Sequence, residues 1–122
     1  MKKKLRNILV IEDDQNVLEA IMGILEYCGY QPKGVTRFSE SVFKQLQTDN
    51  VGLIILDVML SGDDGRDLAV KLKSSEETRG VPILMISAYP EIEYSVMKAG
   101  ADGFIQKPFG IDELMQKVEQ YV

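Results

Sequence analysis

The chain has 122 residues, of which 45% are hydrophobic and 27% are charged, as expected for one globular domain with a single core. Its net charge of −5 weighs against direct binding to nucleic acid, because phosphate backbones are bound by clustered Lys and Arg. The absence of histidine excludes histidine catalysis, histidine metal ligands and a histidine phosphoacceptor within this chain. The single cysteine, Cys28, excludes an intrachain disulfide.

The first residues contain the one basic run, Lys2 to Lys4 with Arg6 close behind, which we expect to be a solvated lead-in to the first strand. The apolar stretch that follows meets acids at Glu12, too soon for a signal peptide or a membrane span. We therefore expect a cytoplasmic protein with no membrane association. Since no linker, repeat or output domain is recognisable, we expect one domain over residues 1–122.

Five strands are predicted, in chain order, at residues 8–11, 31–35, 53–56, 83–86 and 103–106. Continuous apolar runs, such as the first, third and fourth of these, are typical of strands buried on both faces of a sheet. The second strand is short and polar, so we expect it at an edge.

Five helices are predicted between and after these strands, with apolar positions at helical spacing within residues 17–28, 42–46, 68–72, 92–97 and 111–121. Gly29 should end the first helix, because glycine readily adopts the left-handed conformation found after helix ends. Thr36 or Ser39 should cap the second helix. Pro90 should begin the fourth helix, where proline is tolerated, and Gly100 should end it.

Alternating strands and helices predict an α/β fold with a parallel sheet covered on both faces. Right-handed crossovers leave few topologies. We expect a flavodoxin-like (βα)5 three-layer sandwich whose five-stranded parallel sheet has the order 2-1-3-4-5.

Polar side chains gather at the carboxyl ends of the predicted strands, where ligands bind in sheets of this kind. They are Glu12, Asp13, Asp14, Asp57, Ser87 and Lys107. Asp13 or Asp14 could simply cap the first helix. As a set, however, converging carboxylates repel one another unless a cation or a proton offsets their charge. Hard oxygen ligands favour Mg²⁺ or a similar ion such as Mn²⁺.

This combination of groups suits phosphoryl transfer. An aspartate can act as a nucleophile and hold a phosphoryl group as an acyl phosphate. A metal ion and Lys107 would neutralise charge on the phosphoryl oxygens, and the hydroxyl of Ser87 could donate a hydrogen bond to one of them.

Four motifs in this order resemble those of the response-regulator receiver family of two-component signalling, over essentially the whole chain. They are Val10-Ile11-Glu12-Asp13-Asp14, Leu56-Asp57-Val58-Met59-Leu60 with Asp64-Gly65 beyond, Ile86-Ser87-Ala88, and Lys107-Pro108-Phe109. Each is weak alone, but together, at strand ends, they form a specific signal.

The resemblance implies a role for each site residue. Asp57 would be the phosphoacceptor, and Glu12 and Asp13 the acidic pair, with Asp13 the more direct metal ligand. Met59 would offer its backbone carbonyl to the metal. Ser87 would be the switch hydroxyl. Lys107 would contact the phosphate, and a cis peptide bond is expected between Lys107 and Pro108.

The resemblance also implies partners and a signalling mechanism. The donor would be a sensor histidine kinase or a histidine phosphotransfer protein. A downstream protein would bind the face made by the fourth helix, the fifth strand and the last helix, where Glu91, Glu93, Tyr94 and Lys98 are candidates. Such a protein is a switch rather than an enzyme, acting catalytically only on its own phosphorylation and dephosphorylation, and would be a monomer or weak dimer.

Two positions depart from the common family pattern. Phe104 occurs where many receivers have tyrosine, so it could serve as an aromatic switch without a hydroxyl or simply be a core residue. Ser61 replaces a frequent proline in the loop after Asp57, which could loosen that loop.

Three other functions are compatible with parts of this pattern. A flavin-binding protein of this fold would need Gly, Ser and Thr after the first strand to bind phosphate, and the acids at residues 12–14 disfavour it. Phosphatases of the haloacid-dehalogenase type have a second aspartate two residues after the nucleophile. This chain has Met59 at that position, so the resemblance to them fails. A receiver-like interaction module that is never phosphorylated is the most serious alternative, because binding alone needs no chemistry.

Overall fold

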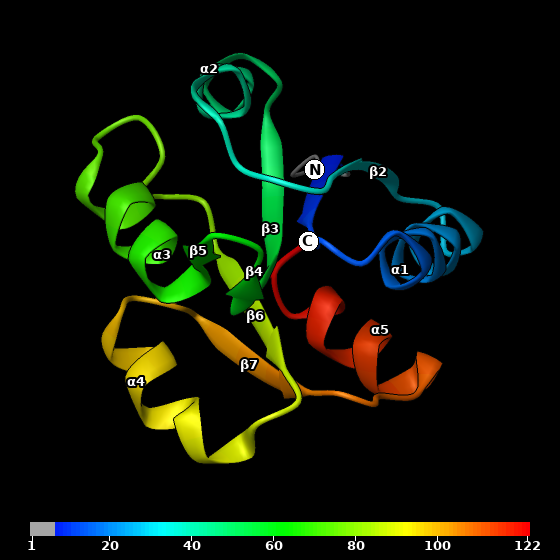
Figure 1. Cartoon of the computed structure of the whole chain (residues 1–122). Coiled ribbons are helices and arrows are strands. Elements are labelled where there is room, and N and C mark those ends of the chain that lie inside the picture. Colours follow the sequence, from blue (N-terminus) through cyan, green and yellow to red (C-terminus); the bar gives the residue numbers. More distant parts are fainter. Residues whose placement is uncertain (1–6) are drawn as a thin grey trace.

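A computed structural model describes residues 7–122 of the chain, as a central sheet with helices on both of its faces (Figure 1). The basic run at residues 2–6 lies outside the described residues. The strands of the main sheet are β1 (Asn7–Ile11), β2 (Gln31–Val35), β3 (Val51–Asp57), β6 (Ile83–Ser87) and β7 (Gly103–Gln106). The α-helices are α1 (Gln15–Tyr27), α2 (Glu40–Thr48), α3 (Gly65–Ser74), α4 (Glu93–Lys98) and α5 (Ile111–Glu119).

The sheet order is β2-β1-β3-β6-β7, and every neighbouring pair is parallel. In the numbering of the five main strands this is the predicted order 2-1-3-4-5, which confirms the expected flavodoxin-like topology. The polar strand β2 lies at an edge, as expected. The chain order reverses between β1 and β3, and their carboxyl ends lead into helices on opposite faces of the sheet. Ligands bind at such a point in sheets of this kind.

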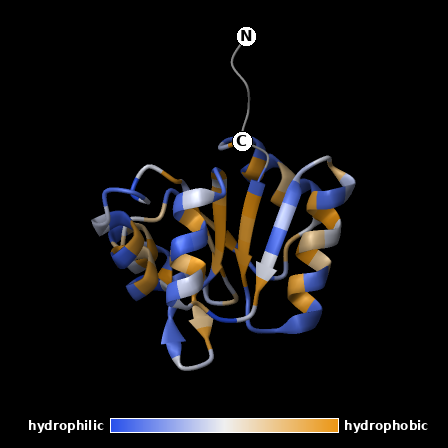
Figure 2. Ribbon diagram, turned by 90° about the horizontal axis from the view of Figure 1, so that it is seen from above, coloured by the Kyte–Doolittle hydropathy of each residue, from blue (hydrophilic) through white to orange (hydrophobic). Residues whose placement is uncertain are grey.

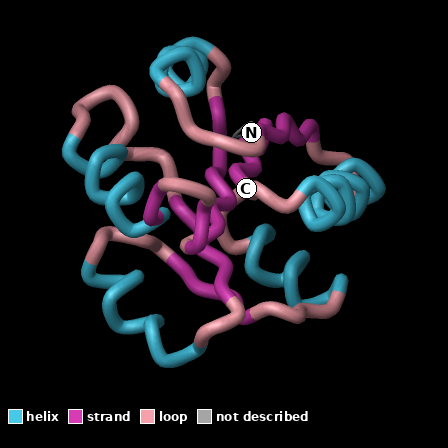
Figure 3. Tube along the Cα trace, in the orientation of Figure 1, coloured by secondary structure: helices cyan, strands magenta, loops and turns pink. Residues whose placement is uncertain are grey.

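Two apolar clusters, one on each face of the sheet, hold the three layers together. Alternate residues of the central strands point to opposite faces, so Ile8 and Ile55 pack toward α1 and α5, whereas Leu9 and Ile54 pack toward α2, α3 and α4. Figure 2 shows mostly hydrophobic strands between helices that carry both hydrophobic and hydrophilic residues, and Figure 3 shows the helices surrounding the strands. The carboxyl ends of the strands are therefore held on a rigid support.

Most predicted boundaries are confirmed. Ser39, not Thr36, caps α2, and its hydroxyl accepts a hydrogen bond from the Val42 N–H. Gly29 and Gly100 follow the ends of their helices with φ values of 91° and 108°, in the left-handed region that glycine occupies without steric cost.

Two features differ from the sequence-based prediction. Pro90 begins a short 3₁₀-helix, η1 (Pro90–Ile92), and α4 starts only at Glu93. The expected apolar face of this helix is also narrower, because Val96 is buried but Met97 is 41% exposed. A small antiparallel hairpin, β4 (Met59–Leu60) with β5 (Asp63–Asp64), follows β3 where only a loop was predicted. Among the described residues, no helix is long and apolar enough to cross a membrane.

Candidate functional site

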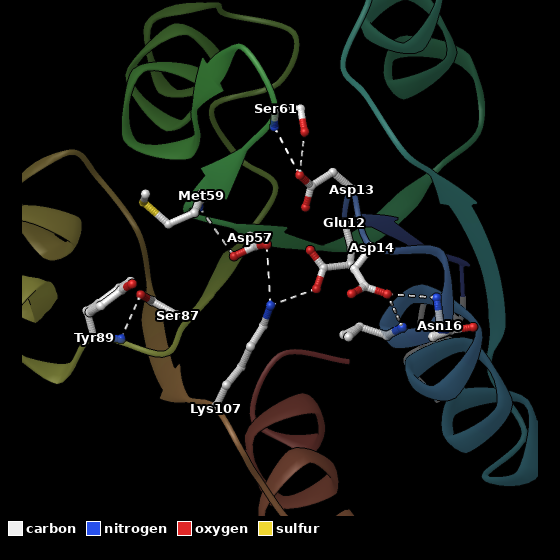
Figure 4. Close-up of polar contacts among 11 residues, drawn as sticks. Glu12, Asp13, Asp14, Asn16, Asp57, Met59, Ser61, Ser87, Tyr89 and Lys107 are labelled. Carbon is white, nitrogen blue, oxygen red and sulfur yellow. Dashed lines mark hydrogen bonds and ion pairs between the residues drawn. The ribbon is translucent and has the colours of Figure 1, made fainter.

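Lys107 joins two carboxylates that lie at the ends of separate strands. Its Nζ atom lies 2.7 Å from Oε1 of Glu12, which follows β1, and 3.3 Å from Oδ2 of Asp57, at the end of β3. Both acids are buried, with 0% and 4% of their surface exposed. Figure 4 shows the lysine side chain reaching between them. The structure thus brings together three residues that the sequence predicted to meet.

Three carboxylates gather at this point. One oxygen from each of Glu12, Asp13 and Asp57 lies within 4.8 Å of the other two. The second carboxylate oxygen of Glu12, Oε2, is buried and has no hydrogen-bond partner among the described residues. A buried, unpaired carboxylate oxygen is costly unless a cation or proton binds it. The donor set consists only of hard oxygens and therefore fits Mg²⁺ or Mn²⁺.

Burial and charge alter the ionisation of this cluster. Burial, with a further contribution from the nearby Asp57 carboxylate, raises the pKa of Glu12 from 4.5 to about 8, although Lys107 acts in the opposite direction. Burial alone would lower the pKa of Lys107, but its contacts with Glu12 and Asp57 outweigh burial and raise that pKa. Lys107 is therefore held as a cation, whereas Glu12 retains its proton to about pH 8 when no metal ion is bound.

Asp13 and Asp14 have different roles although they are neighbours. The Asp14 carboxylate accepts hydrogen bonds from the N–H groups of Asn16 and Val17, at 2.9 and 3.2 Å, and caps α1. The capping interpretation is therefore correct for Asp14. Asp13 instead accepts from the backbone N–H and the hydroxyl of Ser61, at 3.1 and 2.8 Å. Sequence reasoning missed this contact.

Asp57 is positioned by the turn that follows it. The N–H of Met59 donates to Oδ1 of Asp57 at 3.3 Å, and the N–H of Gly65 donates to the Val58 carbonyl at 2.7 Å. A Cβ atom at residue 65 would collide with the Asp57 carbonyl oxygen and the Cα of Val58. Only glycine therefore allows the start of α3 to approach the backbone of the acid so closely.

Ser87 is the last residue of β6, the strand next to β3, and Phe104 lies in β7, one strand further away. The Ser87 hydroxyl accepts a hydrogen bond from the Tyr89 N–H at 3.0 Å, and in Figure 4 it lies on the far side of Asp57 from Glu12. Among the described residues no hydrogen bond joins Ser87 to Asp57. Phe104 is buried in the cluster beneath α4, in the position of a packed core residue. The peptide bond between Lys107 and Pro108 is cis, as predicted.

Comparison with known proteins accounts for this arrangement. The family model described as the response regulator receiver domain matches residues 8–119. The chain belongs to the response regulator receiver family. Receiver domains accept a phosphoryl group on an aspartate in phosphorelay signalling, and Mg²⁺ binding is a general feature of the family. They are signalling switches rather than metabolic enzymes.

Two curated relatives are considerably longer than this chain. The phosphate regulon transcriptional regulatory protein PhoB of Escherichia coli is 36% identical over 116 residues, covering 93% of this chain and 50% of PhoB. The nitrogen assimilation regulatory protein NtrX of Azorhizobium caulinodans is 34% identical over 118 residues, covering 93% of this chain and 25% of NtrX. The chain thus spans at most about half the length of these relatives.

Solved structures agree on the fold. The signal receiver domain of a signal transduction histidine kinase from Syntrophus aciditrophicus is 31% identical, with a TM-score of 0.82 over 93% of this chain and 87% of that chain. The chemotaxis protein CheY4 of Vibrio cholerae has a TM-score of 0.85 over 97% of this chain and 99% of that chain. Its identity is 21%, so this second likeness bears on the fold alone.

Proposed function

We propose that Asp57 is the phosphoacceptor of this receiver domain and that Lys107, Glu12 and Asp13 form its working site. The observation that carries the proposal is the position of the buried Asp57 carboxylate, 3.3 Å from the Lys107 ammonium and beside two further acids. A cation next to a carboxylate that receives a dianionic group offsets the charge that the transfer brings into the site. An interaction module without chemistry would not need this costly set of buried charges.

We propose that the metal ligands are Glu12, Asp13, Asp57 and the backbone carbonyl of Met59, with Asp13 a more direct ligand than Glu12. The unpaired Oε2 atom of Glu12 and the all-oxygen donor set support Mg²⁺, or Mn²⁺ in its place. When bound, the ion would neutralise negative charge on the phosphoryl oxygens.

The transfer itself needs few groups. A carboxylate oxygen of Asp57 attacks the phosphorus of a phosphohistidine, a bond forms between this oxygen and phosphorus, and the phosphorus–nitrogen bond breaks. The bonding electrons and a proton remain with the donor's imidazole. Lys107 stays protonated throughout, since its raised pKa keeps the ammonium charged. Later hydrolysis of the acyl phosphate would use the same groups, so the domain acts catalytically only on its own modification.

The phosphorylated state would be signalled through Ser87 and Phe104. The Ser87 hydroxyl, which accepts a hydrogen bond from the Tyr89 N–H, would move away and donate one to a phosphoryl oxygen. Phe104 would move into the space that this shift leaves. The face made by α4, β7 and α5 would change as a result, and a downstream protein would bind there. Tyr94 supports the choice of this face as a binding surface, because its side chain is 73% exposed and the Lys98 ammonium lies 5.4 Å from its ring centre.

The remaining expectations are part of the same proposal. The donor is a sensor histidine kinase or a histidine phosphotransfer protein, and the residues matched by the family model, 8–119, act as one receiver domain. It works in the cytoplasm as a monomer or weak dimer, and the net charge of −5 favours protein partners over direct contact with nucleic acid.

Phosphorylation by a small donor tests the assignment of Asp57. The protein is incubated with acetyl phosphate and Mg²⁺, and its intact mass is measured. Wild type should gain one phosphoryl group, and a chelator should abolish the gain. Asp57→Asn should gain none, whereas Asp63→Asn, a change in the exposed hairpin β4–β5, should behave as wild type. An unmodified wild type, under conditions in which another receiver is modified, would favour the interaction module.

A further inference from the structure

The hairpin β4–β5 contacts the acidic site through Ser61. Both donors of this residue, its backbone N–H and its hydroxyl, bind one oxygen of Asp13, Oδ2, at 3.1 and 2.8 Å. The two residues are 48 positions apart in the chain, so the contact joins the loop after β1 to the turn after β3. Figure 4 shows Ser61 and Asp13 facing each other at the margin of the cluster.

The turn itself does not require the Ser61 N–H. Strand pairing in the hairpin joins Met59 with Asp64 and Leu60 with Asp63, so Ser61 and Gly62 are the two central residues of a tight turn. Gly62 has a φ of 80°, whereas the φ of Ser61 is not positive. This pattern matches a type II turn, in which proline is favoured at the first central position. A proline at residue 61 would suit the backbone but would remove both donors.

The two hydrogen bonds fix the orientation of the Asp13 carboxylate. With Oδ2 held by Ser61, its other oxygen has no hydrogen-bond partner among residues 7–122 and is available to a cation shared with Glu12 and Asp57. Carboxylate ligands are commonly oriented by such outer hydrogen bonds, and losing one typically weakens metal binding by about 10- to 100-fold.

We propose that Ser61 is a positioning residue for the metal site, orienting Asp13 through both of its donors and thereby setting the affinity for a divalent cation. This inference rests on the proposed function, because Asp13 must be a ligand for Ser61 to matter. Ser61 is not itself a metal ligand, but through Asp13 it sets how tightly this chain binds its metal ion.

Calorimetric titration with Mg²⁺ tests the proposal without any phosphorylation step. Ser61→Pro should raise the Kd for Mg²⁺ about tenfold. Ser61→Ala, which keeps the N–H, should raise the Kd by a smaller factor, and Ser61→Thr, which keeps both donors, should bind as wild type does. Ser74→Ala removes a hydroxyl that donates a hydrogen bond to the Val70 carbonyl within α3 and should leave the Kd unchanged.

Thermal unfolding in a chelator separates positioning from a general loss of structure. Ser61→Pro should unfold at the wild-type temperature or above, since proline suits this turn position. An unchanged Kd in Ser61→Pro, with wild type binding Mg²⁺, would overturn the role of Ser61 alone. A raised Kd in Ser61→Pro together with an unfolding temperature below that of wild type would overturn it too. A wild type that binds no Mg²⁺ would overturn both this inference and the proposed metal site.

Discussion

The Lys107 ammonium lies 2.7 Å from the buried Glu12 carboxylate although the two residues are 95 positions apart. The parallel sheet explains this proximity, since the residues that follow β1 and β7 both lie at the carboxyl ends of the strands. The same lysine lies 3.3 Å from Asp57. It is therefore the one cation within contact of the acidic cluster in the described part of the chain, and several consequences depend on it.

Replacing Lys107 with methionine should slow phosphorylation by acetyl phosphate about 100-fold. The variant loses the fixed charge that stabilises the phosphoryl oxygens, and the loss of one such group typically has this magnitude. The rate is measured by stopping the reaction at a series of times and recording the intact mass of the protein in each sample. Lys71→Met is the matched control, because that lysine ion-pairs with Glu40 at 3.2 Å on the exterior. Equal rates in the two variants would contradict the role of Lys107.

In the presence of a chelator, the free energy of unfolding should fall as the pH rises from about 4.5 to about 8. The pKa of Glu12 is about 8 in the folded protein and 4.5 ordinarily, so across this range the folded state retains a proton that the unfolded state has released. Stability gained from this group is complete below pH 4.5 and lost above pH 8. Urea unfolding at a series of pH values measures the slope.

Glu12→Gln is the control for this pH dependence. Glutamine cannot titrate, so its variant should show a much flatter profile over the same range. A wild-type stability that rises toward pH 8, or an identical slope in the variant, would show that Glu12 is already ionised in the folded protein.

Gly65→Ala should destabilise the fold by about 1–3 kcal/mol, the usual cost of forcing atoms into a packed region. The added methyl group would meet the Asp57 carbonyl oxygen and the Val58 backbone, neither of which can move without shifting the end of β3. Gly23→Ala offers the matched comparison, because nothing lies within 4 Å of a Cβ there. It should stabilise α1 by roughly 0.5–1 kcal/mol. Equal effects in thermal unfolding would contradict this account of residue 65.

Binding of beryllofluoride, a phosphoryl analogue, should change NMR shifts beyond the site in wild type. If Ser87 transmits the signal, the changes should reach Phe104 and α4, and Ser87→Ala should confine them to the residues around Asp57. Ser41→Ala, which alters an exposed hydroxyl paired with Ser39, should respond as wild type does. Changes confined to the site in wild type itself would rule out this coupling.

Much of this fold was predictable because each central strand is a continuous apolar run. Ile54 and Leu56 face one layer of helices, Leu53 and Ile55 face the other, and only strands covered on both faces have that pattern. The site was predictable from the topology, since the residues that follow parallel strands lie together at the carboxyl ends of those strands. Asp57 and Lys107 could therefore be paired before any distance was known.

The hairpin β4–β5 and its contact with Asp13 were not predictable in the same way. Two-residue strands show no periodicity, and the polar residues from Ser61 to Asp64 indicate only a loop. The position of Ser61 opposite Asp13 depends on how the β3–α3 connection approaches the loop that follows β1. No local pattern specifies that path, although the glycine at residue 62 was a signal for a tight turn.

The most direct test of the central claim is to identify the phosphorylated residue chemically. After phosphorylation with acetyl phosphate and Mg²⁺, borohydride reduces an aspartyl phosphate to homoserine, and peptide mass spectrometry locates the change. We predict homoserine at residue 57 alone, with Asp13, Asp63 and Asp64 unmodified, and none when a chelator is present. Homoserine at another aspartate, or no homoserine in a protein whose mass shows a phosphoryl group, would contradict the assignment of Asp57.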